Sequence, residues 1–104
     1  MREVSYVVDL GPDARKRHHH RASRGRVVEF VVQLEVKLEG EWKPVVRYDC
    51  AHGYAHRDRY NRKGEKQTDD LGFLDYNEAL ALADRDINRN WREYRERFLQ
   101  GGFS

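Results

Sequence analysis

The chain has one cysteine, Cys50, among its 104 residues, and it has no long apolar run. A single cysteine cannot form an internal disulfide, which is typical of proteins in a reducing compartment. No stretch approaches the roughly 18 apolar residues that a transmembrane helix needs. The first residues include Glu3 and Asp9 and lack the small-residue cleavage site of a signal peptide. The sequence therefore predicts a cytoplasmic protein.

Apolar residues are also few, because 38% of the chain is hydrophobic and 37% is charged. A chain of this length is expected to form one domain, here residues 1–104, with a modest core. Such a small core is often completed by a second copy of the chain, so we expect a homodimer. Its interface is expected near the basic segments, where Val31 and Val45 add apolar area to the sheet.

Positive charge is concentrated in two segments, although the formal net charge is only +2. Residues 11–26 hold six Arg or Lys and one Asp, and residues 57–66 hold five Arg or Lys and two acids, whereas the charges of residues 76–99 cancel. This distribution predicts an anionic partner bound at a defined place. Residues 11–25 have no apolar periodicity, and we interpret them as an exposed basic loop.

The fold class predicted from the hydrophobic pattern is α+β. Residues 4–10 have the composition of a strand, and apolar and polar residues alternate from Phe30 to Leu38, as in a strand with one wet face. A turn at Gly40-Glu41 predicts a long hairpin over residues 27–50. With further extended segments near 52–60 and 65–71, the sequence predicts an antiparallel meander of four to five strands.

One long helix is predicted over residues 76–99, packed on the sheet. Asp75 and Glu78 have the spacing of a capping box. Apolar residues then recur every three or four positions, which predicts the face that packs on the sheet: Ala79, Ala83, Ile87, Trp91, Tyr94 and Phe98.

The residues best suited to chemistry lie in "RYDCAHGYAHRDRY", which spans residues 47–60. In a flat strand His52 and His56 would be about 13 Å apart, too far to serve one phosphorus atom. A bend at Gly53 would bring the two imidazoles together, because glycine adopts backbone angles that other residues avoid. The sequence leaves both arrangements open.

Three kinds of chemistry suit this segment. Histidines can remove and donate protons when a ribose 2′-OH attacks the adjacent phosphorus, while arginines stabilise the phosphoryl charge. A metal site built from the two histidines with Asp49, Cys50 and Asp58 is the second reading, although the strand-like flanks and the absence of tight Cys/His pairs argue against it. A nucleophilic Cys50 is the third, and its position beside the core disfavours it.

The segment also resembles a known family. Arg47-Tyr48-Asp49, Ala51-His52-Gly53, His56-Arg57 and the downstream run 77–80 resemble small bacterial proteins related to the TumE-type toxins of toxin–antitoxin pairs, over roughly residues 45–97. The resemblance implies action on RNA and a cognate antitoxin as partner. The sequence departs from the family pattern at one position, because Asp58 stands where the motif has a further histidine.

These observations predict a metal-independent ribonuclease-type phosphodiesterase that needs no cofactor. A ring nuclease that degrades cyclic oligoadenylates in CRISPR defence and a non-catalytic RNA-binding module are the alternatives. The expected catalytic residues are His52, His56, Arg57 and Arg47. The expected substrate-binding residues are Tyr48, Tyr54, Asp58, Arg59, Arg17, His18, His19, His20 and Arg21.

Overall fold

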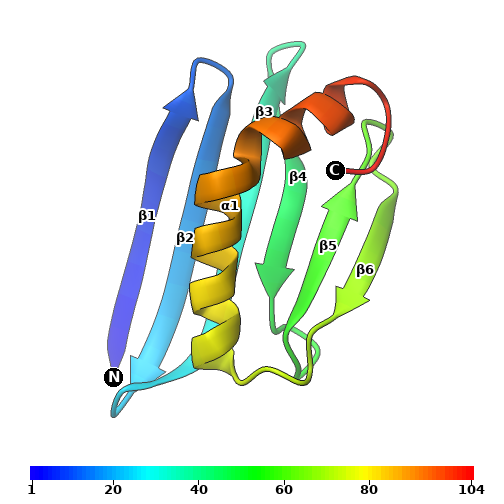
Figure 1. Cartoon of the computed structure of the whole chain (residues 1–104). Helices are drawn as coiled ribbons and strands as arrows, with labels where there is room; N and C mark the ends of the chain where they lie inside the picture. The colour runs from blue at the N-terminus through cyan, green and yellow to red at the C-terminus, as the bar shows by residue number, and fades with distance from the viewer.

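A computed structural model describes all 104 residues as one twisted antiparallel sheet with a helix on one side (Figure 1). The six strands follow chain order across the sheet, so every connection is a short turn between neighbours. The elements are β1 (Arg2–Gly11), β2 (Ala14–Ser23), β3 (Arg26–Leu38), β4 (Glu41–Asp49), β5 (His56–Tyr60), β6 (Lys66–Asp70) and α1 (Tyr76–Leu99). The predicted α+β class is confirmed, as is the central position of the hairpin β3–β4.

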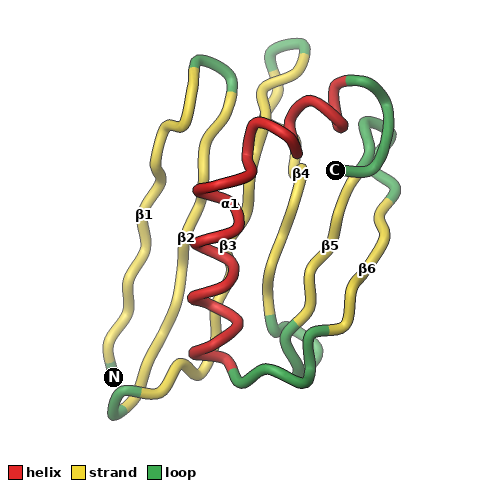
Figure 2. Tube along the Cα trace, viewed as in Figure 1, coloured by secondary structure: helices red, strands yellow, loops and turns green.

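The prediction of an exposed loop at residues 11–25 is corrected, since most of this segment is strand β2, and the sheet has six strands rather than four or five. Strand β2 pairs with both β1 and β3 (Figure 2). Sequence patterning missed it because its positions facing the helix are Ala14, Lys16, His18 and His20, which show no apolar alternation. The three polar side chains are buried or half-buried there because they find hydrogen-bond partners.

Two of the turns depend on a left-handed residue followed by glycine. Arg24 and Gly25 have φ values of 54° and 79°, and Glu39 and Gly40 have 54° and 82°. Positive φ at both central residues is the signature of the type I′ turn, whose twist matches that of the flanking strands. The turn predicted at Gly40-Glu41 therefore lies one residue earlier.

Pro44 lies within the central strand β4, where a proline is normally excluded because it has no N–H to donate. The register explains its presence. Leu34 pairs with Val46 and Glu35 pairs with Pro44, so Val45 is an extra residue that forms a β-bulge. The bulge buries both Val45 and Val46, and this burial removes Val45 from the apolar surface predicted for a dimer interface.

Helix α1 matches the predicted residues and begins with the predicted capping box. The Asp75 side chain accepts from the Glu78 backbone N–H, and the Glu78 carboxylate accepts from the Asp75 N–H. Its buried residues pack on β3 and β4 and form one core with the inward residues of the sheet. Trp91, predicted in the core stripe, is only half-buried and lies over Gly11, where a Cβ would approach its ring to 3.1 Å.

Because side chains alternate along a strand, the sheet has two distinct faces. We call the side covered by α1 the helix face and the other side the open face. Tyr48 and Arg57 contact the helix, so their neighbours Arg47, Asp49, His56 and Asp58 belong to the open face. The helix is too polar to cross a membrane.

Candidate functional site

The turn after β4 brings the two predicted histidines together. Gly53 has a φ of 87°, so the chain bends there rather than continuing as a strand. The ring centroids of His52 and His56 are 5.4 Å apart, and the Tyr54 ring lies 5.7 Å from that of His56. Of the two arrangements that the sequence left open, the structure has the bent one. His52 is exposed, whereas His56 is buried beneath the turn.

His56 lies between two buried carboxylates of the open face. Its Nε2 is 2.8 Å from Asp49 Oδ1 and 3.7 Å from Asp58 Oδ2, and only 4–5% of each side chain is exposed. Its Nδ1 lies 3.4 Å from the Tyr54 carbonyl oxygen. Both ring nitrogens are thus engaged within the protein, which leaves His52 as the histidine of this pair that solvent can reach.

A chain of polar contacts extends from this pair across the open face. Arg47 donates from Nε to Asp49 at 2.5 Å and from Nη1 to Gln33 at 3.3 Å. Gln33 in turn donates to Glu35 at 2.7 Å, and Glu35 accepts from Arg17 of β2. The contacts therefore connect β2 to β5, and Asp49 is the shared partner of Arg47 and His56.

Hydrogen bonding controls the charge of the two acids in this chain. Burial acts to raise the pKa of Asp49, but hydrogen bonds from Arg47 and the Ala51 N–H outweigh it and lower the pKa below its ordinary value. The pKa of Glu35 is likewise lowered, because bonds from Arg15 and Gln33 outweigh its burial. Both acids are therefore held as carboxylates that orient the arginines.

Asp49, His56 and Asp58 are also the one group whose donor atoms lie close enough together to hold a metal ion, within 4.8 Å of one another. Their charges argue against a divalent ion. Arg47 already pairs with Asp49, and Lys66 Nζ lies 3.6 Å from Asp58 Oδ2, so an added ion would bring two uncompensated positive charges. Thr68 also donates to Asp58 at 2.6 Å, as expected of a satisfied structural cluster.

A cavity of about 460 Å³ lies between this turn and β2, lined by His19, Val31, Asp49 and Cys50 among others. His19 places one residue of the predicted basic segment in the same cavity as the turn. Burial raises the pKa of the Cys50 thiol, which disfavours the thiolate that a nucleophile requires.

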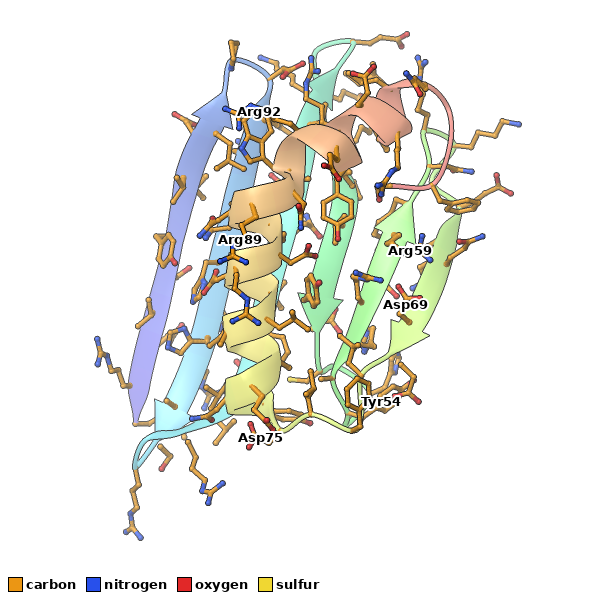
Figure 3. All side chains as sticks on the ribbon, in the orientation of Figure 1. Tyr54, Arg59, Asp69, Asp75, Arg89 and Arg92 are labelled. Atoms are coloured by element: carbon orange, nitrogen blue, oxygen red, sulfur yellow. The ribbon has the colours of Figure 1, made fainter.

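Other predicted site residues are divided between the two faces. Arg17, His19 and Arg21 share the open face with His52 and His56, since Lys16, His18 and His20 alternate with them and face the helix. Arg57, Arg59 and Tyr48 also belong to the helix face, so they do not join the predicted site. Arg57 and Arg59 both pair with Asp69 of β6. Figure 3 labels Arg59 and Asp69, which lie close together on β5 and β6.

Sequence reasoning missed a carboxylate of the helix face that accepts three hydrogen bonds, Asp86 of α1. It accepts the hydroxyls of Tyr48 and Tyr94, each at 2.5 Å, and the Asn90 amide at 2.7 Å. Burial and the bond to Asp86 raise the pKa of Tyr94 to about 12. The signal that was available is spacing, because Asp86, Asn90 and Tyr94 follow one another at four-residue intervals on one helix face.

The fold and the site define a small α+β domain: an antiparallel meander whose open face carries a chain of partly buried polar contacts and a histidine pair in which His52 is exposed and His56 is buried. The chain belongs to the family described as a domain of unknown function, DUF7718, whose model matches residues 1–104. No curated protein and no solved structure matches the chain.

Proposed function

We propose that this protein is a metal-independent ribonuclease-type phosphodiesterase whose reacting centre is the turn at Gly53. The observation that carries the proposal is the contact of His52 with the His56–Asp49 pair beside Arg47, on a face that also carries Arg17 and His19. Accessible imidazole and guanidinium groups are the two side-chain types that a 2′-OH attack on phosphorus needs.

Each group in this centre is assigned a role from its exposure and partners. His52, the exposed imidazole, exchanges the proton of the 2′-OH or of the leaving 5′-oxygen. Arg47, about one-third exposed and oriented by Asp49, contacts the phosphoryl oxygens. Tyr54 offers an exposed ring on which a base can stack. His56 is a positioning residue, because its nitrogens are bound to the protein and its ring lies under that of His52.

RNA is the proposed substrate class, and the linear and cyclic forms share the chemistry. A linear strand would extend from the turn across β3 to the arginines of β2, where phosphates meet Arg17 and Arg21. A cyclic oligoadenylate would instead place its 2′-OH and phosphate at the same turn. The resemblance to TumE-type toxins supports the linear form, in which the chain is the toxin of a pair with an antitoxin.

The test is incubation of the purified chain with linear RNA and, separately, with cyclic oligoadenylates in the presence of EDTA. Cleavage by 2′-OH attack gives a 2′,3′-cyclic phosphate and a 5′-hydroxyl, and a 2′-O-methyl group at the cleaved position abolishes it. Arg47→Ala should lower the rate about 10²-fold or more. Arg89→Ala, which removes an exposed arginine of α1, is the matched control and should leave the rate unchanged.

Two outcomes would replace this proposal. Loss of cleavage in EDTA with rescue by a divalent ion would assign Asp49, His56 and Asp58 to a metal site. Salt-sensitive binding of RNA without cleavage would instead identify a non-catalytic RNA-binding module.

A homodimer also stays a prediction. Strand β1 is an unpaired edge of the sheet, and its residues Tyr6, Val7 and Val8 are 39–47% exposed. Pairing of this edge with a second copy would cover them. Light scattering at high micromolar concentration should report twice the monomer mass, and a monomer mass at every concentration would contradict the prediction.

A further inference from the structure

A second cluster of titratable side chains lies on the helix face, away from the proposed reacting centre. Asp84 of α1 accepts from Lys16 Nζ at 3.1 Å and lies 3.0 Å from Nδ1 of His18. Nε2 of His18 lies 2.6 Å from Nδ1 of His20. The Tyr6 ring stacks on His18 with centroids 4.6 Å apart. A carboxylate and two imidazoles are therefore held in a row.

The partners of this row determine where its protons lie. Lys16 is 4% exposed and already balances the charge of Asp84, so a further buried positive charge on His18 would be costly. A carboxylate can only accept, which places the proton of neutral His18 on Nδ1 and leaves its Nε2 as an acceptor. His20 must then donate from Nδ1, and its Nε2 carries a free electron pair.

This free nitrogen is open to solvent. No fully buried side-chain nitrogen or oxygen lacks a hydrogen-bond partner, and Nε2 of His20 has none, so it must be accessible. His20 lines a cavity of about 550 Å³ together with Arg2 and Arg24. The cavity is thus lined by three nitrogen-bearing residues, one each from β1, β2 and the turn after β2.

We propose that this cavity binds a phosphate group, and that His20 takes up a proton on Nε2 when the anion enters. The proton comes from solvent, and Nε2–H then donates to a phosphate oxygen beside the guanidinium groups of Arg2 and Arg24. The bond from Nδ1 of His20 to His18 is kept, so no proton within the row has to move. This site lies on the opposite face from His52, and it does not depend on the proposed nuclease activity.

The charges around His20 explain why protonation and binding are coupled. Burial, and then the positive charge of Arg2, lower the pKa of His20, so the His20 imidazole is neutral near pH 7 while the two arginines stay charged. A bound dianion reverses this balance and favours the imidazolium. Affinity therefore rises as pH falls. The titratable and charged groups that face this cluster from the packed elements are Arg2, Tyr6, Lys16, His18, Arg24 and Asp84, and His19 acts on it from the open face.

The test uses the full chain with ¹⁵N-labelled histidine and sulfate as the probe. Sulfate is tetrahedral like phosphate, and its charge is constant between pH 6 and pH 8. Before addition, His20 should carry its proton on Nδ1. When sulfate binds, Nε2 of His20 should take up a proton from solvent, and the affinity for sulfate should be about tenfold higher at pH 6 than at pH 8. His19, the adjacent histidine on the open face, is the internal reference and should shift far less.

Two variants test the origin of the effect. His20→Gln should abolish the pH dependence of sulfate affinity. His18→Phe keeps a ring against Tyr6 but removes the acceptor, so the His20 proton should be distributed over both nitrogens. The proposal is overturned if free His20 carries its proton on Nε2 at neutral pH. It is overturned equally if sulfate shifts His19 as much as His20, or if affinity is the same at both pH values.

Discussion

Replacing Asp86 with alanine should destabilise the fold more than any other single change to a charged residue of α1. The substitution removes the acceptor of two tyrosine hydroxyls, and Tyr48 is only 1% exposed. A hydrogen bond to a charged group contributes about 1.5–3 kcal/mol, and a buried donor without a partner is costly in itself. Because the two bonds share one acceptor and are not additive, we expect a loss of about 2–4 kcal/mol.

Urea denaturation followed by circular dichroism measures this loss. With a slope of about 2 kcal/mol per molar urea, the midpoint should fall by about 1–2 M. Asp86→Asn keeps one acceptor oxygen and should lose less. Glu93→Ala is the matched control, since Glu93 is 69% exposed and pairs only with Arg97, and its effect should stay within about 0.5 kcal/mol. Equal midpoints for Asp86→Ala and Glu93→Ala would refute the reasoning.

Three further predictions follow from the same contacts. The lowered pKa values of Asp49 and Glu35 stabilise the fold above the unfolded carboxyl pKa of about 4. The urea midpoint should therefore fall as the pH drops below about 4, and it should fall less steeply in Asp49→Asn. The same pH dependence of the midpoint in Asp49→Asn and in the unaltered chain would count against the Asp49 contacts. The pKa of Tyr94 is raised to about 12, whereas a tyrosine in the unfolded chain loses its proton near pH 10. The fold should therefore lose stability as the pH rises above about 10. Ultraviolet titration should show Tyr94 ionising after the exposed tyrosines. The alanine of Gly53→Ala has room for its methyl group, but it must hold φ near 87°, at a cost of about 1–2 kcal/mol. Cleavage should slow in this variant because His52 is displaced. An unchanged rate would show that the conformation of this turn does not matter for cleavage.

Local patterns were sufficient to predict the hairpin β3–β4 and the helix, because their apolar residues face the core at the periods of a strand and a helix. Strand β2 could not be found this way. Its inward positions are occupied by Lys16, His18 and His20, and what makes them tolerable is Asp84, which is distant in sequence. Hydrophobic periodicity carries no information about such long-range polar pairing.

The candidate site was predictable in composition but not in geometry. The motif predicted one site for His52, His56 and Arg47. Gly53 bends the chain and brings the His52 ring near that of His56, and Asp49 is the shared partner of His56 and Arg47. Arg57 was expected beside them, but strict alternation along β5 places it on the other face from its neighbour His56. The burial of His56 between two carboxylates depends on the pairing of three strands, which the motif does not encode.

In the proposed reaction His52 exchanges protons with the substrate, and His56 holds the His52 ring in position. The most direct test compares single-turnover cleavage of RNA by His52→Ala and by the unaltered chain in EDTA, together with the urea midpoint of each. We expect the His52→Ala rate to be lower by about 10²- to 10⁴-fold with an unchanged midpoint, since His52 is exposed. A His52→Ala protein that cleaves RNA at the full rate would contradict it.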